Sequence, residues 1–245
     1  MQPISINVAL VSFAVAFLMS WIASNFLLFR RPCSCCQRTL ARIYYINLDD
    51  RQDRNKLFNK INRSFIARVP TERWPGVKFE REGLNKRKLA EIGCSMAHES
   101  VLRHISKQDD EVQGIQAWYL VMEDDAKIPS DFDATATLCS RPFVDKHAGV
   151  VQLSAGLACT YPLARIERIR SWFLPAEISN GFRYRTGAYI IRPGAALDLA
   201  DHIARGGHDK PVDEWWQKLR ANFKVYGICM IRQGDASVTK SSIVV

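Results

Sequence analysis

No charged side chain occurs between Ile4 and Phe29, where the sequence is dominated by apolar residues. As a helix rising about 1.5 Å per residue, this stretch exceeds the roughly 30 Å hydrocarbon thickness of a bilayer. No Lys or Arg precedes it, and bulky residues follow it in place of a small-residue cleavage site, which argues against a cleaved signal peptide. We therefore expect residues 1–40 to be a single-pass transmembrane anchor and juxtamembrane segment, with the span at about residues 4–29.

The absence of basic residues ahead of the span also bears on its orientation. Arg30, Arg31, Arg38 and Arg42 all follow it. The positive-inside rule then favours a cytoplasmic position for the rest of the chain. The glycosylation sequon that begins at Asn62 would stay unmodified on that side of the membrane.

The cysteines form no disulfide framework. Cys33, Cys35 and Cys36 directly follow the span, which favours palmitoylation, and a zinc site there has no fourth ligand at suitable spacing. The remaining four are scattered along mostly apolar stretches, and we predict that they are core thiols. They are Cys94, Cys139, Cys159 and Cys229.

The net charge of +9 is not accompanied by an arginine-rich helix or an aromatic RNA-binding signature. The basic residues are spread along the chain, which suits a polyphosphate substrate or an anionic membrane surface, and we expect no nucleic-acid partner. No repeat or low-complexity tract divides residues 41–245. Their length is that of one α/β domain with a sizeable core.

Within this domain, strand-like and helix-like patterns alternate, which predicts a mainly parallel sheet with flanking helices. The predicted strands are residues 42–50, 65–70, 117–122, 149–155 and 188–193. The predicted helices are residues 51–62, 89–107 (one helix or a broken pair) and 194–204. Because ligands bind at the carboxyl ends of such strands, we expect the acidic clusters at residues 49–50 and 123–125 to face one cleft.

Three consecutive carboxylates, Glu123, Asp124 and Asp125, end the strongly apolar strand at residues 117–122. Like charges so close repel one another and resist burial. A divalent cation would relieve both effects, because Mg²⁺ and Mn²⁺ take hard oxygen ligands. The alternative is an acidic turn in water, and these three residues alone leave both interpretations open.

Six segments in order carry a resemblance to a known family: "YYINLDDRQDR", "EIGCSMAHESVLRHI", "LVMEDDAKI", "RTGAYIIRPGA", "DKPVDEWW" and "IRQGDASVTKSSI". Together, from about Ile43 to Ile243, they resemble glycosyltransferase family 25, which includes bacterial lipopolysaccharide galactosyltransferases and collagen β-galactosyltransferases. The resemblance implies a GT-A-type fold, a UDP-sugar donor (usually UDP-galactose), Mn²⁺ or Mg²⁺, and inversion at the anomeric carbon. Glycan, lipid-linked and protein acceptors all remain open.

The same resemblance assigns roles to individual residues. Glu123 and Asp125 match the outer carboxylates of the metal motif, and Asp213 matches the base that takes the acceptor proton. Asp213 could equally cap the helix predicted at residues 214–223. The implied donor-binding residues are Asp49, Arg51, Arg54, His98, Asp124, Thr186 and Gly187.

Two features leave other interpretations open. Arg54 could serve a surface helix through pairing across one turn. Ala97 stands where the family usually has Ser before His98. The rival functions are a nucleotidyltransferase, which also needs paired carboxylates, and a catalytically silent, membrane-anchored module that binds sugar nucleotides.

Overall fold

The computed structural model describes residues 38–112, 115–128, 148–153 and 187–208, and the short stretches 20, 132, 138, 176–177, 210, 212, 214–215, 224–227 and 232–233. Apart from residue 20, the predicted span at residues 4–29 lies outside the described residues. Among those described, no helix is both long and apolar enough to cross a membrane.

An eight-stranded sheet forms the centre of the described structure, in the order β2-β1-β4-β8-β6-β9-β7 with β3 paired to β4, and β5 pairs separately with β10. The strands are β1 (Arg38–Asn47), β2 (Thr71–Pro75), β3 (Glu111–Val112), β4 (Ile115–Glu123), β5 (Ala126–Lys127), β6 (Ala148–Gln152), β7 (Ala176–Glu177), β8 (Ala188–Ile191), β9 (Lys224–Gly227) and β10 (Arg232–Gln233). The helices are α2 (Gln52–Ile61), α3 (Arg63–Ile66), α4 (Lys86–Ile105) and α7 (Pro193–Arg205).

The sheet is mixed, which corrects the expectation of a mainly parallel one. Strand β1 runs parallel to β2 and β4, and β6 runs parallel to β9. Between these groups, β8 is antiparallel to both β4 and β6. Antiparallel neighbours need no helical crossover between them. The alternation of strand and helix patterns in the sequence therefore cannot predict which strands are antiparallel. As a result, the start of β8 lies beside the carboxyl end of β4.

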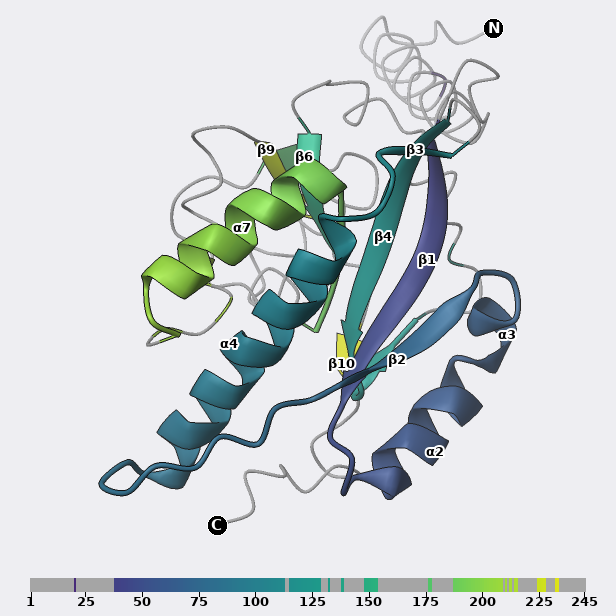
Figure 1. The fold of residues 1–245 in the computed structure, drawn as a ribbon. Coiled ribbons are helices and arrows are strands. Elements are labelled where there is room, and N and C mark those ends of the chain that lie inside the picture. Colours follow the sequence, from purple (N-terminus) through teal and green to yellow (C-terminus); the bar gives the residue numbers. More distant parts are fainter. Residues whose placement is uncertain are drawn as a thin grey trace, which may run out of the picture.

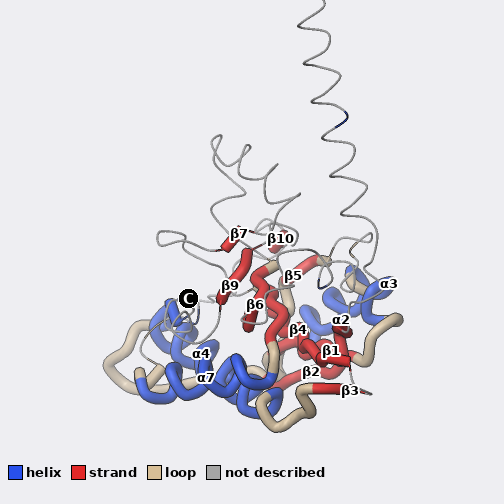
Figure 2. The backbone as a smooth tube through the Cα atoms, turned by 90° about the horizontal axis from the view of Figure 1, so that it is seen from above, coloured by secondary structure: helices blue, strands red, loops and turns tan. Residues whose placement is uncertain are grey.

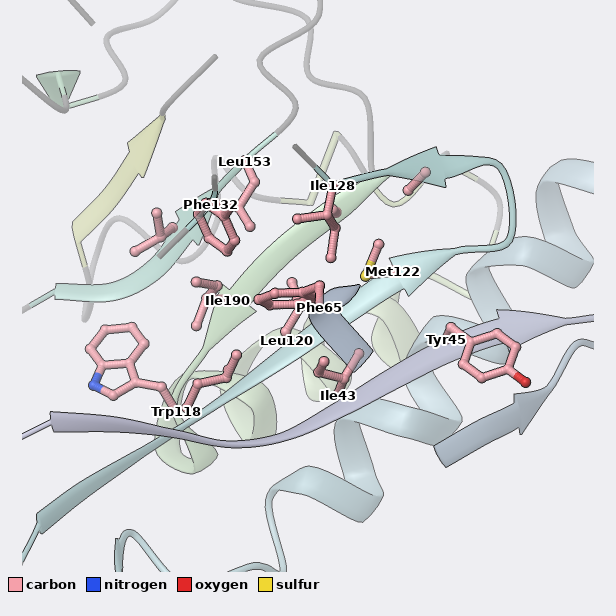
Figure 3. Close-up of a cluster of buried hydrophobic side chains, with 14 of the residues drawn as sticks. Ile43, Tyr45, Phe65, Trp118, Leu120, Met122, Ile128, Phe132, Leu153 and Ile190 are labelled. Atoms are coloured by element: carbon pink, nitrogen blue, oxygen red, sulfur yellow. The ribbon is translucent and has the colours of Figure 1, made fainter. Parts of the chain in front are cut away.

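Helices cover both faces of the sheet: α2 and α3 pack on one, and α4 and α7 on the other (Figures 1 and 2). Successive strand side chains point to opposite faces, so β1 and β4 supply both cores. Figure 3 shows the core on the α2 and α3 side, which includes Ile43, Tyr45, Trp118, Leu120 and Met122. The core on the α4 and α7 side includes Tyr44, Tyr119, Val121, Val101 and Leu199.

The second predicted strand, residues 65–70, is wrong. The chain there forms α3 and a turn, and β2 begins only after Pro70, where it pairs parallel with β1. Phe65 is buried against Phe132, with ring centroids 5.5 Å apart. A short apolar run fits a buried helical turn as well as a strand, and its periodicity cannot separate the two.

The uncertain pattern at residues 89–107 is one continuous helix, α4. The Asn85 side chain caps it by accepting a hydrogen bond from the Lys88 N–H at 2.8 Å. Inside the helix, Gly93 lies against the segment that follows β2. A Cβ at Gly93 would lie 2.3 Å from the Val77 carbonyl oxygen, so only glycine allows this close approach.

Asn62, the first residue of the sequon, is buried between α2 and α3. Its Nδ2 donates to the Ala126 carbonyl at 3.1 Å, and its Oδ1 accepts from the Ile128 N–H at 2.9 Å. The side chain thereby ties the helices to the segment after β4. In the folded chain this amide is not available for glycosylation, so Asn62 cannot report which side of a membrane the domain occupies.

Candidate functional site

The three carboxylates that end β4 point in different directions. Glu123 continues the alternation that faces α4, and its carboxylate lies near His98. Asp124 faces the opposite side, toward α2. The cluster is therefore divided between the two faces of the sheet and not gathered on one.

Asp124 is held by two neighbours. Its Oδ2 accepts from Asn47 Nδ2 at 2.8 Å, and its Oδ1 accepts from Arg54 at 2.8 Å. The Asp124 and Arg54 side chains are 11% and 16% exposed, so this ion pair is largely shielded from water. Both residues were assigned to donor binding from the sequence, and here they bind each other. The sequence did not indicate the buried Asn47 as a partner of Asp124, because Asn47 is the last residue of β1 and belongs to no recognisable motif with Asp124.

Asp125, the third carboxyl group of the cluster, has a raised pKa. Its burial raises the pKa of this carboxyl from 3.8 to about 6, and the charges of Glu123 and Asp124 add to the effect while Arg54 opposes it. Its Oδ1 is buried and has no hydrogen-bond partner in the described part of the chain. An unpaired buried carboxylate oxygen costs free energy that a cation would offset. The unpaired oxygen of Asp125 therefore fits a ligand of a divalent cation.

The loop after β1 holds further charged pairs. Arg73 donates to Asp49 at 2.5 Å, and its other terminal nitrogen donates to the Asn47 carbonyl at 3.2 Å. Arg51 binds both carboxylate oxygens of Asp53, which lowers the pKa of that exposed carboxyl to about 2. Nothing in the sequence indicated Arg73, because it meets Asn47 and Asp49 only through the pairing of β2 with β1.

His98 is completely buried on α4. Its Nδ1 lies 2.8 Å from the Tyr189 hydroxyl, and its Nε2 lies 3.6 Å from Glu123 Oε1. Burial raises the pKa of Tyr189 well above 10, so the phenol stays protonated. Tyr189 lies in the strand predicted at residues 188–193, and its ring is buried in the core, but its hydroxyl reaches a predicted site residue.

Gly187 joins the same region through its backbone. Its carbonyl accepts a hydrogen bond from the Glu123 N–H at 2.9 Å. The antiparallel direction of β8 produces this contact, since a parallel strand would place Gly187 at the opposite edge of the sheet. Thr186 lies outside the described residues.

Asp213 also lies outside the described residues, and only its neighbours are placed. The Lys210 carbonyl accepts from Ser95 Oγ on α4 at 2.8 Å. Trp215 is buried against Gly206, where a Cβ would come within 1.8 Å of the indole ring. The described residues on both sides of Asp213 thus pack against α4 and the end of α7.

A groove of about 520 Å³ opens beside β2, between Tyr45, Asn59, the 66–71 segment and Arg73. Of these residues, only Arg73 takes part in the network at the end of β1. The groove does not include the carboxylates of β4.

No family model and no curated protein matches the chain. Among solved structures, a glycosyltransferase involved in glycosylation of the major capsid of PBCV-1 is similar at TM-score 0.42 and 7% identity over 77% of this chain and 82% of that one. Mouse xyloside xylosyltransferase 1 is similar at TM-score 0.36 and 9% identity, over 81% and 88% of the two chains. A putative glucose-1-phosphate thymidylyltransferase from Bacillus anthracis is similar at TM-score 0.38 and 12% identity, over 80% and 73%. Similarity at this level does not define a family or an activity.

Proposed function

We propose that the chain is a metal-dependent inverting glycosyltransferase of the GT-A type, anchored in a membrane through residues 4–29. It transfers a hexose from a UDP-sugar to a glycan, lipid-linked or protein acceptor. The resemblance to glycosyltransferase family 25 favours galactose as the hexose. The observation that carries the proposal is Asp125, a half-buried carboxylate with a buried, unpaired oxygen, close to Glu123 at the carboxyl end of a central strand.

Glu123 and Asp125 would hold the Mn²⁺ or Mg²⁺. When bound, this cation would stabilise the negative charge that develops on departing UDP. Asp124 would act on the donor site indirectly: Asn47 and Arg54 fix its carboxylate, and this fixes the turn that carries Asp125.

The loop after β1 supplies cations for the donor phosphates. Arg51 and Arg73 are held by Asp53 and Asp49, whose side chains are 68% and 75% exposed. Exposed ion pairs contribute little to stability, so a diphosphate could replace these carboxylates at small cost. The Arg54 pair is more buried and would stay in place while it adds positive charge to the site. Asp49, once released, could bind a ribose hydroxyl.

Asp213 is the proposed base. It would take the proton of the acceptor hydroxyl while the hydroxyl oxygen attacks the anomeric carbon from the side opposite UDP, which inverts that carbon. The backbone at Thr186 and Gly187 would meet the sugar or the diphosphate, since Gly187 is bonded to Glu123. His98 would border the donor site from α4, next to Glu123.

The test is a donor screen of the purified chain with Mn²⁺, scored both by UDP release and by the fate of labelled UDP-galactose and UDP-glucose. We expect sugar transfer or slow donor hydrolysis that chelation abolishes. Transfer of the nucleotide to an acceptor would establish the rival nucleotidyltransferase. Donor binding without turnover on any acceptor would establish a silent binding module.

The membrane assignment has its own test. We propose that the domain faces the cytoplasm, on the basis of the arginines that follow the span. Protease accessibility in sealed vesicles is the suitable measurement, because the buried Asn62 cannot act as a glycosylation reporter. Protection of the domain inside the vesicles would reverse the assignment.

A further inference from the structure

A second group of metal-ligating side chains lies beside the carboxylate cluster. Cys94 and His98 are four residues apart on α4, so their side chains share one face of the helix. Glu123 reaches the same place from the end of β4. One ligand atom from each of the three residues lies within 4.8 Å of the other two.

The hydrogen bonding of the two ring nitrogens of His98 gives an independent indication that this residue binds a metal ion. Its Nδ1 is engaged by the Tyr189 hydroxyl at 2.8 Å, as the second nitrogen of a metal-bound imidazole usually is. Its Nε2 is buried and makes no hydrogen bond within the described part of the chain. This nitrogen points at Glu123 Oε1 over 3.6 Å, which is too long for a hydrogen bond.

That distance suits two ligands of one ion. With Nδ1–H donated to Tyr189, the lone pair of Nε2 faces a carboxylate oxygen, and two acceptors repel one another unless a cation lies between them. Tetrahedral Zn²⁺, with bonds of about 2.0–2.3 Å, keeps its ligand atoms about 3.3–3.7 Å apart. The distance between Nε2 and Oε1 would therefore need little change on binding.

The ligand set also selects the type of cation. A thiolate, an imidazole and a carboxylate are ligands of Zn²⁺ and related borderline metals, whereas Mg²⁺ and Mn²⁺ prefer oxygen. Cys94 is half-buried and the Glu123 side chain is 25% exposed, so an ion can enter from solvent.

We propose that Cys94, His98 and Glu123 form a Zn²⁺ site with three protein ligands and a fourth position open to water. Binding converts the Cys94 thiol to a thiolate, and its proton is released to solvent. The sequence alone suggested only a core thiol at Cys94, because Glu123 joins the site through the tertiary fold.

The two cation sites share Glu123. Zn²⁺ at Cys94 and His98 would withdraw this carboxylate from the cation that it holds with Asp125. Zn²⁺ and Mn²⁺ should therefore compete, and Zn²⁺ should inhibit transfer. This consequence rests on the proposed function, whereas the binding of Zn²⁺ does not.

Co²⁺ is the probe for binding, because its visible spectrum reports tetrahedral geometry and its ultraviolet charge-transfer band reports a thiolate ligand. We expect the metal-free, reduced full chain to show both features and to lose them when one equivalent of Zn²⁺ is added. Cys94→Ala should remove the charge-transfer band and weaken Zn²⁺ binding by about 100-fold or more. Tyr189→Phe should weaken it by about tenfold, the lower end of the range for outer-shell partners.

Two control variants make the result specific. Cys36→Ala tests the cysteine group near the predicted span, and it should leave the Co²⁺ spectrum unchanged. Asp125→Asn should leave Zn²⁺ affinity within about threefold while it weakens Mn²⁺ binding. A thiolate band that survives Cys94→Ala, or one that disappears in Cys36→Ala, would overturn the proposed site. Neither result depends on glycosyl transfer, so a failure here is separate from a failure of the proposed function.

Discussion

Arg54 of α2 and Asp124 at the end of β4 form an ion pair at 2.8 Å across 70 residues of sequence. The Asn47 side chain completes the arrangement from the end of β1. These three side chains join α2 to β1 and β4 at the carboxyl ends of the strands, where the candidate site lies. If the proposed donor site is correct, donor binding and folding stability depend on neighbouring side chains of one network.

Breaking this pair from one side should destabilise the fold. Arg54→Met leaves Asp124 as a largely buried charge without its cation, and we expect a loss of about 2–4 kcal/mol in the free energy of unfolding. Asp124→Asn added to Arg54→Met should recover more than half of that loss, because the remaining group is neutral. Urea denaturation of the two single variants and the double variant measures the coupling. Additive losses would show that the pair contributes nothing to stability.

Asp125→Asn separates catalysis from stability. Because the folded-state pKa of Asp125 is raised to about 6 from 3.8, the stability held by its protonated form is complete below about pH 4 and is lost as pH rises through 6. The neutral variant should therefore be more stable than the metal-free wild type at pH 7–8, by on the order of 2–3 kcal/mol, and the difference should vanish toward pH 4.

Mn²⁺ provides the matching measurement for Asp125. Added Mn²⁺ should raise the melting temperature of the wild type and have a much smaller effect on Asp125→Asn, because the variant lacks one ligand. Transfer by the variant should be abolished. An unchanged Mn²⁺ response together with normal transfer would remove Asp125 from the cation site.

Asn62→Ala should destabilise the domain, since it leaves the Ile128 N–H and the Ala126 carbonyl without their partner in a buried region. We expect a loss of about 2–4 kcal/mol for the two hydrogen bonds. Asn59→Ala, at an exposed position of α2, is the matched control and should change stability by less than about 1 kcal/mol. Equal effects of the two substitutions would contradict the structural role of Asn62.

Asp213→Asn tests the proposed base. Asn caps a helix nearly as well as Asp, so stability should change little. It cannot accept the acceptor proton, and kcat for transfer should fall about 100-fold or more while UDP affinity stays the same. A normal kcat would make Asp213 only a cap. Lost UDP affinity with normal kcat would instead assign it to donor binding.

Local patterns in the sequence were enough to locate most of the elements. The apolar run at residues 117–122 lies within β4, the run at residues 188–193 contains β8, and the helix predicted at residues 51–62 contains α2. Residues 117–122 and 188–191 are apolar and all buried, as expected for central strands of a sheet covered on both faces. The run at residues 65–70 has the same length but failed, because a buried helical turn and a strand place similar apolar residues over so few positions.

The carboxylate cluster was visible in the sequence as three adjacent acids, but the partner of each acid was decided by the tertiary structure. Strand alternation sends Glu123 to His98 and Asp124 to Arg54, and both partners come from distant helices. The antiparallel direction of β8 places Gly187 and Tyr189 beside them. A sequence specifies which side chains are available and how they alternate, whereas strand order and direction are set by packing among distant segments, and these determine which of those side chains meet.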